Sequence, residues 1–422
     1  TKPTVSFQSD TNSSLSLSTG FPTKTFRLSP VGLVGREKER RQLFECLRRS
    51  TSKNQFVLLE GYAGSGKSAL ARWLDNCVSA KQEGLCFSGK YSQNQEDEPY
   101  AAVAQVCRQI CVHLGGSCGS DVNPNFAVSF EDGNDKIREL TESLRRELGG
   151  DGGILARLLP SLQLLLSHNS GERFSIRQRD DSVLRDDQIR LHMAFRVFFR
   201  TVCRFTKMVI VIDDLQWADQ PSIDLFEYLF GDPENSSLMI VGCRRIDNAC
   251  CSNSLSTLIE RMQNPSGKSK TFVDFTRIQV HDLSIEAVHA IVEVSLNLKN
   301  DTTVRQLAEV IHGKTLGNAF YTLQVLSTIC EDEIIKLDSN TKKLTWDLDR
   351  VRLRASTSSD ALELLEAKLQ RLPLSFRCLI QLATCLGTQI NEEPYRWVVD
   401  DFYNDPAKYF GISRAVSSGR LE

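Results

Sequence analysis

Short apolar runs separated by polar segments predict a series of buried strands in the first two thirds of the chain. They cover residues 55–60, 84–89, 208–213 and 238–242, with a further strand over residues 277–280. Helical segments lie between these runs, and strands that alternate with helices are typical of parallel β-α-β units. The pattern therefore predicts an α/β protein whose parallel sheet is flanked by helices.

Apolar residues spaced three or four positions apart predict the helices. An amphipathic helix is expected over residues 36–49, where Leu43, Phe44 and Leu47 stand on a charged background. Four further helices are predicted in this part of the chain: from Lys67 onward and over residues 100–114, 188–205 and 221–230. From residue 284 the pattern is mostly helical.

Polar segments mark the places where regular structure is not expected. The first 30 residues hold 13 Ser or Thr and few aliphatic residues, so we predict a disordered lead-in over residues 1–30. The stretches 115–135 and 167–182 predict loops. A hairpin is expected over residues 334–348, with its turn at the polar residues 338–340.

Composition and charge narrow the class of protein. The chain has 422 residues, of which 51 are Lys or Arg and 53 are Asp or Glu, so its net charge is −2. This balance argues against a broad basic surface for nucleic acid. The longest apolar stretch, residues 154–166, is interrupted by Arg157, Pro160 and Gln163. It is too short and too broken to cross a bilayer, so no membrane association is expected.

The cysteines indicate the compartment. Thirteen are scattered along the chain, with only Cys250 and Cys251 adjacent and without a Cys-x-x-Cys pair. In a chain long enough to bury a core, this predicts free thiols in a reducing, cytoplasmic environment. The chain opens without a signal-peptide pattern and begins at Thr1, which favours a fragment of a longer protein.

A phosphate-binding loop (P-loop) follows the first predicted strand. Eight residues fit the pattern G-x-x-x-x-G-K-[ST]: Gly61, Tyr62, Ala63, Gly64, Ser65, Gly66, Lys67 and Ser68. Glycines let the backbone curl so that successive N–H groups point at phosphate oxygens, and the following helix adds its positive N-terminal end. In such loops the lysine reaches the β- and γ-phosphates and the hydroxyl ligates Mg²⁺. The loop therefore predicts an ATP and Mg²⁺ site in which Lys67 also assists catalysis.

Two carboxylates end the most apolar strand. Asp213 and Asp214 close the run over residues 208–214. An acid at the end of such a strand holds Mg²⁺ directly or through water, and a second acid beside it is placed to orient or deprotonate the attacking water. A helix N-cap or a turn explains many acids at strand ends. The P-loop upstream favours a metal ligand at Asp213, together with Ser68, and a general base at Asp214.

Arginines end the strand predicted over residues 238–242. Arg245 is placed to sense the γ-phosphate and to spread its charge during transfer. The alternative is an ion pair with a surface carboxylate, which we favour more strongly for Arg244 than for Arg245.

Together these residues resemble the AAA+-like ATPase domain of large signalling regulators, a group that includes origin-recognition-like ATPases and the signal-transduction ATPases with numerous domains (STAND). Residues 213–219, D-D-L-Q-W-A-D, are similar to the family's D-D-L-[QH]-W-A-D, and residues 33–39 are similar to its h-h-G-R-E-x-E opening. Pro99-Tyr100 and residues 158–160 match further family segments, and residues 241–245 stand at its V-G-x-x-R sensor.

The resemblance implies a domain organisation and roles for several residues. It implies a P-loop ATPase core over residues 31–283, a helical lid with a hairpin over residues 284–355, and a truncated winged-helix-like region over residues 356–422. More helical lid is the alternative for the last region. Gly35 and Arg36 are expected to pack by the adenine, and Arg245 to act as the sensor. Ala319 replaces the proline of the family's G-N-P-F segment, which puts the contact of the lid with the base in question.

The function implied by the resemblance is that of an ATP-binding, Mg²⁺-dependent signalling switch that hydrolyses ATP slowly. Its expected partners are ATP and ADP, other domains of a longer chain (of kinase, cyclase or repeat type), and further copies of itself in a nucleotide-dependent assembly. A non-hydrolysing nucleotide-binding scaffold is the first alternative. A DNA-associated ATPase of replication-origin type is the second, and the net charge of −2 argues against it.

Overall fold

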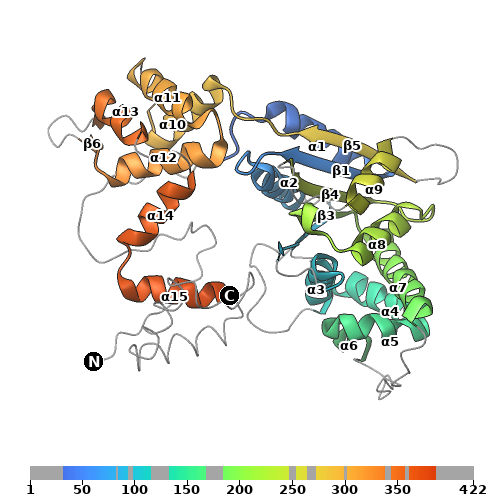
Figure 1. Cartoon of the computed structure of the whole chain (residues 1–422). Coiled ribbons are helices and arrows are strands. Elements are labelled where there is room, and N and C mark those ends of the chain that lie inside the picture. The colour runs from blue at the N-terminus through green and yellow to red at the C-terminus, as the bar shows by residue number, and fades with distance from the viewer. Residues whose placement is uncertain are drawn as a thin grey trace. The chain divides into compact units, whose positions relative to one another are not determined.

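The computed structural model describes residues 32–81, 84–93, 98–115, 133–167, 184–246, 253–263, 272–298, 302–337, 344–356 and 361–385. The chain divides into two compact units, and their boundary falls between Asp282 and Leu283 (Figure 1). The predicted lead-in over residues 1–30, the hairpin turn at 338–340 and the end of the winged-helix-like region after residue 385 lie outside the described residues, as do most of the two predicted loops.

A five-stranded parallel sheet forms the centre of the first unit. Its strands are β1 (Asn54–Gly61), β2 (Leu85–Lys90), β3 (Met208–Asp213), β4 (Leu238–Arg245) and β5 (Val273–Gln279). They lie side by side in the order β2-β3-β4-β1-β5, and each neighbouring pair is parallel. β1 is buried along its whole length, as expected of a strand whose two faces are both covered by helices.

Two helices cover one face of the sheet. They are α1 (Glu37–Arg49) and α2 (Lys67–Lys81). Every second residue of β1 points to this side, so Val57 and Leu59 pack with Leu43 of α1 and Leu70 of α2 in one core.

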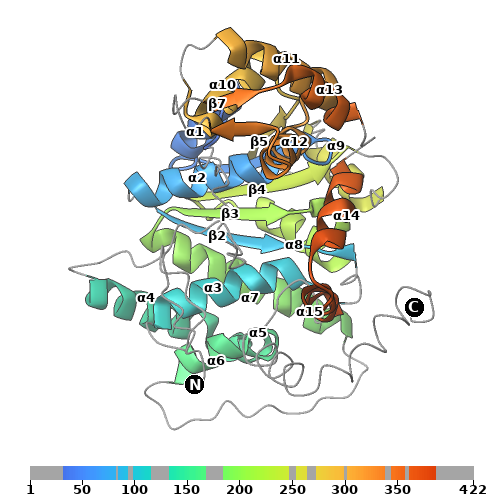
Figure 2. The ribbon, with the colours of Figure 1, turned by 90° about the vertical axis from the view of Figure 1, so that its left-hand side faces the viewer.

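Among the described residues, seven helices contribute to the core on the other face, where Phe56 and Leu58 of β1 are buried. They are α3 (Ala101–Gly115), α4 (Gly133–Leu148), α5 (Gly152–Leu158), α6 (Pro160–Ser167), α7 (Leu184–Phe205), α8 (Gln220–Phe230) and α9 (Asn253–Gln263). Of these, α3 packs directly against β2 (Figure 2). The predicted parallel sheet flanked by helices is thus confirmed.

The topology of the sheet brings four chain segments to one edge. Because the strands are parallel, β1 ends at Gly61, β2 at Lys90, β3 at Asp213 and β4 at Arg245 on the same side. The pairing is in register there, since Lys90 lies opposite Asp213 and Gly61 opposite Arg245. The carboxyl edge of a parallel sheet is the usual place for a ligand site in this class of fold.

The described part of the second unit is mostly helical. Its elements are α10 (Ile285–Leu296), α11 (Thr302–Thr315), α12 (Ala319–Glu331), β6 (Ile335–Leu337), β7 (Leu344–Trp346), α13 (Leu348–Ser356), α14 (Ala361–Arg371) and α15 (Leu374–Cys385). β6 and β7 form an antiparallel pair at the predicted hairpin. The lid and winged-helix-like assignments stay predictions.

The start of α12 explains how Ala319 is tolerated. The side chain of Asn318 caps the helix by accepting a hydrogen bond from the N–H of Tyr321 at 3.0 Å. Ala319 is the first helical residue, a position where proline is favoured but is not needed to satisfy the backbone. The exchange of proline for alanine therefore leaves the helix start intact.

Several elements differ from the prediction. β4 extends to Arg245 and β5 begins at Val273, so both strands are longer than their apolar runs. Charged residues end β4 because its last two residues reach the ligand edge, where water or a ligand replaces the core. α4 and α9 were not predicted as helices, although both are clearly amphipathic segments, of 16 and 11 residues, whose spacing of apolar residues fits a helix.

Two properties of the described residues bear on the sequence predictions. None of the described helices has the length and the apolar character needed to cross a membrane. Nine cysteines in the described part of the chain are free thiols, and eight of them are buried.

Candidate nucleotide-binding site

The P-loop connects β1 directly to α2. Gly64 and Gly66 have φ angles of +76° and +99°, which only glycine adopts readily. The carbonyl of Gly66 accepts hydrogen bonds from the N–H groups of Ala69 and Leu70, both at 3.1 Å, so the helix begins within the loop. The glycines therefore form the curled backbone that presents N–H groups and a helix N-terminus to an anion.

Lys67 lies across this loop. Its Nζ donates hydrogen bonds to the carbonyl oxygens of Gly61 and Tyr62 at 2.8 Å and 2.7 Å, and only 8% of the residue is exposed. Tyr62 itself is 59% exposed. The cation is thus held within the ring of main-chain groups, where it can exchange carbonyl partners for phosphate oxygens.

Ser68 and Asp213 are brought together from positions 145 residues apart. The Oγ of Ser68 donates a hydrogen bond to Oδ2 of Asp213 at 2.9 Å, and the other carboxylate oxygen accepts the N–H of Asp214 at 3.0 Å. A hydroxyl and a carboxylate are hard oxygen ligands of the kind that Mg²⁺ prefers, with phosphate and water oxygens as the remaining ligands. The residues present fit Mg²⁺.

Asp214 is held by three side chains. Its Oδ1 accepts hydrogen bonds from Nε2 of Gln216 at 2.8 Å and from Nε of Arg245 at 3.2 Å. Its Oδ2 forms an ion pair with Nζ of Lys90 at 3.1 Å. The backbone of Asp214 is left-handed, with a φ of +52°, a conformation that Asp adopts more readily than most residues.

The surroundings keep Asp214 ionised. Burial alone would raise the pKa of its carboxyl, but the hydrogen bonds from Gln216 and Lys90 and the charge of Arg245 outweigh burial and hold the pKa below its ordinary value. An anion that already has partners on both oxygens is suited to orienting a water molecule. Because its pKa is lowered, it is a weak proton acceptor.

The two arginines at the end of β4 have different partners. Arg245 joins the Asp214 cluster, and its own N–H donates to Oε1 of Gln216 at 3.1 Å. Arg244 pairs with Glu60, a carboxylate only 2% exposed, at 3.4 Å, and Arg277 of β5 contacts the same carboxylate. Both arginines thus form ion pairs, but with the largely buried carboxylates of Glu60 and Asp214 and not with a surface carboxylate. The sensor role of Arg245 stays a prediction.

Gly35 and Arg36 lie at the start of α1. Gly35 is left-handed, with a φ of +70°. Arg36 is buried, and its guanidinium donates to the carbonyl oxygens of Ser65 at 2.8 Å and His281 at 2.6 Å. The expected contact of these two residues with adenine stays a prediction, and the observed contact of Arg36 is with the P-loop backbone.

Comparison with known proteins fits this geometry. The family model described as the AAA ATPase domain matches residues 32–241, a segment that includes the P-loop, Asp213 and Asp214. Residues 32–241 belong to the AAA ATPase domain family. The chain is thus an AAA+-like P-loop ATPase in this part.

Individual proteins similar to the chain share less of the sequence. Hybrid signal transduction histidine kinase G of Dictyostelium discoideum is 21% identical over 87% of the chain, but the chain spans only 12% of that protein. A STAND protein with a tetratricopeptide repeat sensor from Pyrococcus horikoshii is 15% identical, with a TM-score of 0.39, covering 90% of this chain and 39% of that chain. A Walker-type ATPase of Pyrococcus abyssi is 13% identical, with a TM-score of 0.39, covering 88% and 89%. At these sequence identities and TM-scores, the two structures do not indicate the function of this chain.

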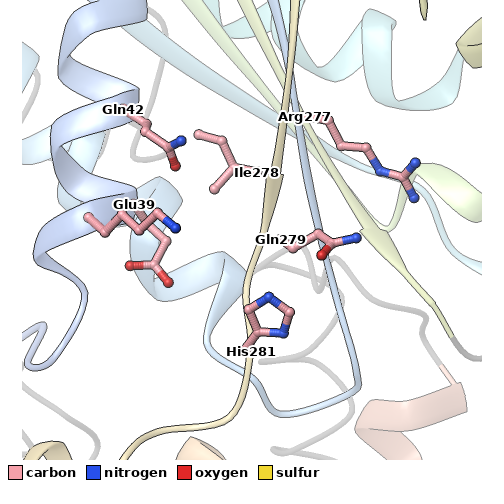
Figure 3. A pocket seen from close by; sticks show the side chains of 7 residues that line it. Glu39, Gln42, Arg277, Ile278, Gln279 and His281 are labelled. Atoms are coloured by element: carbon pink, nitrogen blue, oxygen red, sulfur yellow. The ribbon is translucent and has the colours of Figure 1, made fainter.

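A pocket of the first unit lies between α1 and the edge strand β5, with a volume of about 290 Å³ (Figure 3). Glu39 and Gln42 line it from α1, and Ile278 and His281 line it from β5 and the segment after it (Figure 3). None of its lining residues belongs to the P-loop, so the pocket is separate from the phosphate-binding groups.

Two residues that contact the site were not predicted from the sequence. Lys90 ends β2 directly opposite Asp213, and Gln216 bridges Asp214 and the backbone of Arg245. The sequence did contain a signal for Lys90, because this lysine directly follows a strand that was predicted to belong to the parallel sheet. The sequence does not give the order of the strands, however, and that order was needed to place Lys90 beside β3.

Proposed function

We propose that this chain is an ATP-binding, Mg²⁺-dependent signalling switch of STAND type and one part of a longer multidomain regulator. The observation that carries this proposal is the contact of Ser68 with Asp213 at 2.9 Å at the start of α2. It joins a P-loop hydroxyl and an acid at a strand end, the pair that holds Mg²⁺ in P-loop ATPases. The AAA ATPase family of residues 32–241 supports the same function.

The chain's own groups account for nucleotide binding. Lys67 would release the carbonyls of Gly61 and Tyr62 and donate to β- and γ-phosphate oxygens, while the N–H groups around Gly64 and Gly66 bind the remaining oxygens. Ser68 and Asp213 would hold Mg²⁺, which when bound neutralises phosphate charge. Each of these groups already lies at the carboxyl edge of the sheet.

The chain's groups also support slow hydrolysis. Attack of water on the γ-phosphorus breaks its bond to the β–γ bridging oxygen and yields ADP and phosphate. Asp214 would orient that water, but Lys90, Gln216 and Arg245 occupy both of its oxygens. The carboxylate has about four lone-pair sites and can still accept a water molecule, but its partners lower its pKa and therefore its basicity, which favours a switch that turns over slowly.

The signalling role is supported by the relative that is a hybrid signal transduction histidine kinase. The segment similar to this chain makes up only 12% of that kinase, so other domains make up most of it. By analogy, we propose that the present chain acts on further domains of a longer protein according to whether it holds ATP or ADP, and that it acts inside the cell.

One observation favours a second candidate function. The engagement of Asp214 by three side chains is also expected of a scaffold that binds ATP and does not hydrolyse it. Titration of the chain with Mg²⁺-ATP and Mg²⁺-ADP tests the binding that both functions share. A single-turnover assay with radiolabelled ATP separates them, because only the switch releases phosphate.

Asp213→Asn is expected to weaken Mg²⁺-ATP binding by about 10- to 100-fold, since an amide loses the charge that attracts the metal. Binding of ATP in the presence of EDTA should change by less than about threefold, because the role of Asp213 acts through the metal. Isothermal titration in the two buffers measures both values. Equal losses with and without Mg²⁺ would show a folding defect instead of a metal ligand.

A further inference from the structure

A buried cation, the guanidinium of Arg36, contacts the backbone of the P-loop. Arg36 is only 4% exposed, and its guanidinium has three partners: the carbonyl of Ser65 at 2.8 Å, the carbonyl of His281 at 2.6 Å and Glu39 at 3.4 Å. A buried charge is unfavourable unless polar groups surround it. The hydrogen bonds of Arg36 therefore hold the backbone segments whose carbonyl groups accept them.

The bond to Ser65 fixes a peptide group of the P-loop. In a trans peptide the C=O and the following N–H point in opposite directions. When Arg36 holds the carbonyl of Ser65 on the outer side, the N–H of Gly66 is turned to the inner side of the loop, where phosphate binds. Polarisation of the same peptide by a cation strengthens that N–H as a donor.

The bond to His281 fixes the segment that leads to the second unit. This segment, residues 280–282, follows β5 and precedes Leu283, where the main segment of the second unit begins. It is also tied to β1 directly before the P-loop, because the N–H of Val280 donates to the carbonyl of Glu60 at 2.6 Å. A Cβ on Gly61 would lie only 2.4 Å from the carbonyl oxygen of Val280, so the two backbones are in direct contact.

We infer that Arg36 is a positioning residue that couples the phosphate-binding conformation of the P-loop to residues 280–282, and thereby passes nucleotide occupancy toward the second unit. The inference rests on the proposed function, because it assigns a regulatory path to the same nucleotide site. A planar guanidinium suits this role because it donates in two directions at once. A lysine ammonium keeps the charge but has no rigid fork to hold both carbonyls.

The first experiment compares Arg36→Lys with a control on the same helix. Arg40 lies one turn further along α1, and its guanidinium stacks on Trp73 at 4.8 Å, so Arg40→Lys tests the general effect of such an exchange. Isothermal titration with Mg²⁺-ATP should show affinity lowered about 10- to 100-fold for Arg36→Lys and by less than about threefold for Arg40→Lys. Equal affinity of Arg36→Lys and wild type overturns the inference.

The first arm of the second experiment uses the wild-type chain alone and remains valid if Arg36→Lys does not fold. Hydrogen–deuterium exchange of the wild-type chain, with and without Mg²⁺ and a non-hydrolysable ATP analogue, should show slower exchange of the amides of residues 280–282 when nucleotide is present. In folded Arg36→Lys saturated with nucleotide, this protection should be lost while that of the P-loop remains. A purely structural role would leave the protection of residues 280–282 unchanged between the two proteins.

The outcomes separate the inference from the proposed function. A wild-type chain that binds neither Mg²⁺-ATP nor Mg²⁺-ADP overturns the proposed function and the inference with it. A wild-type chain that binds nucleotide but shows no change of exchange in residues 280–282 overturns the coupling alone. Loss of P-loop protection without loss at residues 280–282 in Arg36→Lys also contradicts the coupling.

Discussion

Lys67→Ala is expected to lower the affinity for Mg²⁺-ATP by at least about 100-fold, because two or more hydrogen bonds from a cation to phosphate are worth roughly 1.5–3 kcal/mol each. The lysine is the P-loop's own cation, and its Nζ already lies within the loop, on the carbonyls of Gly61 and Tyr62. Alanine leaves the curled backbone of Gly64 and Gly66 in place but removes the charge. Isothermal titration measures the loss.

Lys53→Ala is the matched control for this experiment. Lys53 precedes β1 at the opposite end of the strand and pairs with Asp274 on the surface. Lys53→Ala changes the net charge by the same amount as Lys67→Ala. The affinity of Lys53→Ala for Mg²⁺-ATP should nevertheless stay within about twofold of wild type, because Lys53 is a surface residue. If Lys67→Ala and Lys53→Ala bind nucleotide equally well, the P-loop assignment is wrong. A thermal melt of each variant shows whether it is folded.

Asp214→Asn is expected to retain ATP and to lower its hydrolysis by about 10²- to 10⁴-fold, the usual contribution of a group that activates the attacking water. The amide is nearly isosteric with the carboxylate, and Asn tolerates the left-handed backbone at this position, where φ is +52°. The amide cannot, however, accept hydrogen bonds on both sides from Lys90 and Arg245. A single-turnover assay measures hydrolysis directly and is the appropriate test if the wild type is slow.

The control for Asp214→Asn is Asp274→Asn, which removes a carboxylate at the other end of the sheet. It should hydrolyse ATP at the wild-type rate. Hydrolysis by Asp214→Asn at that same rate would refute the role of Asp214. If the wild type itself shows no turnover, the scaffold is the correct function.

The pKa of Asp214 adds an expectation for the pH dependence of the wild type. Because the pKa lies below its ordinary value, the carboxyl is ionised throughout the neutral range. Its ionisation contributes stability above the unfolded pKa of about 3.9, and this contribution is lost as the pH falls through the lower, folded value. Titration of Asp214 should therefore produce no acid limb in the hydrolysis rate between about pH 6 and pH 8.

The sequence by itself determined the elements that depend on local pattern. A buried strand needs consecutive apolar residues, and the P-loop needs its glycines, Lys67 and Ser68 in fixed succession, so both were evident without any knowledge of neighbours. The acid pair Asp213 and Asp214 was evident because it ends the most apolar run in the chain. The alternation of strands with helices was enough to predict a parallel sheet.

Only the tertiary structure decided which groups complete the site. The order β2-β3-β4-β1-β5 places Lys90 and Arg245 on the two strands beside β3, where both reach Asp214. It also decided that Arg36 holds the carbonyls of Ser65 and His281, which are 29 and 245 residues away from it. These contacts depend on long-range strand pairing and on the burial of a charge among backbone carbonyls. Neither leaves a periodic pattern in the sequence, because the same arginine or lysine on a solvated surface would look identical.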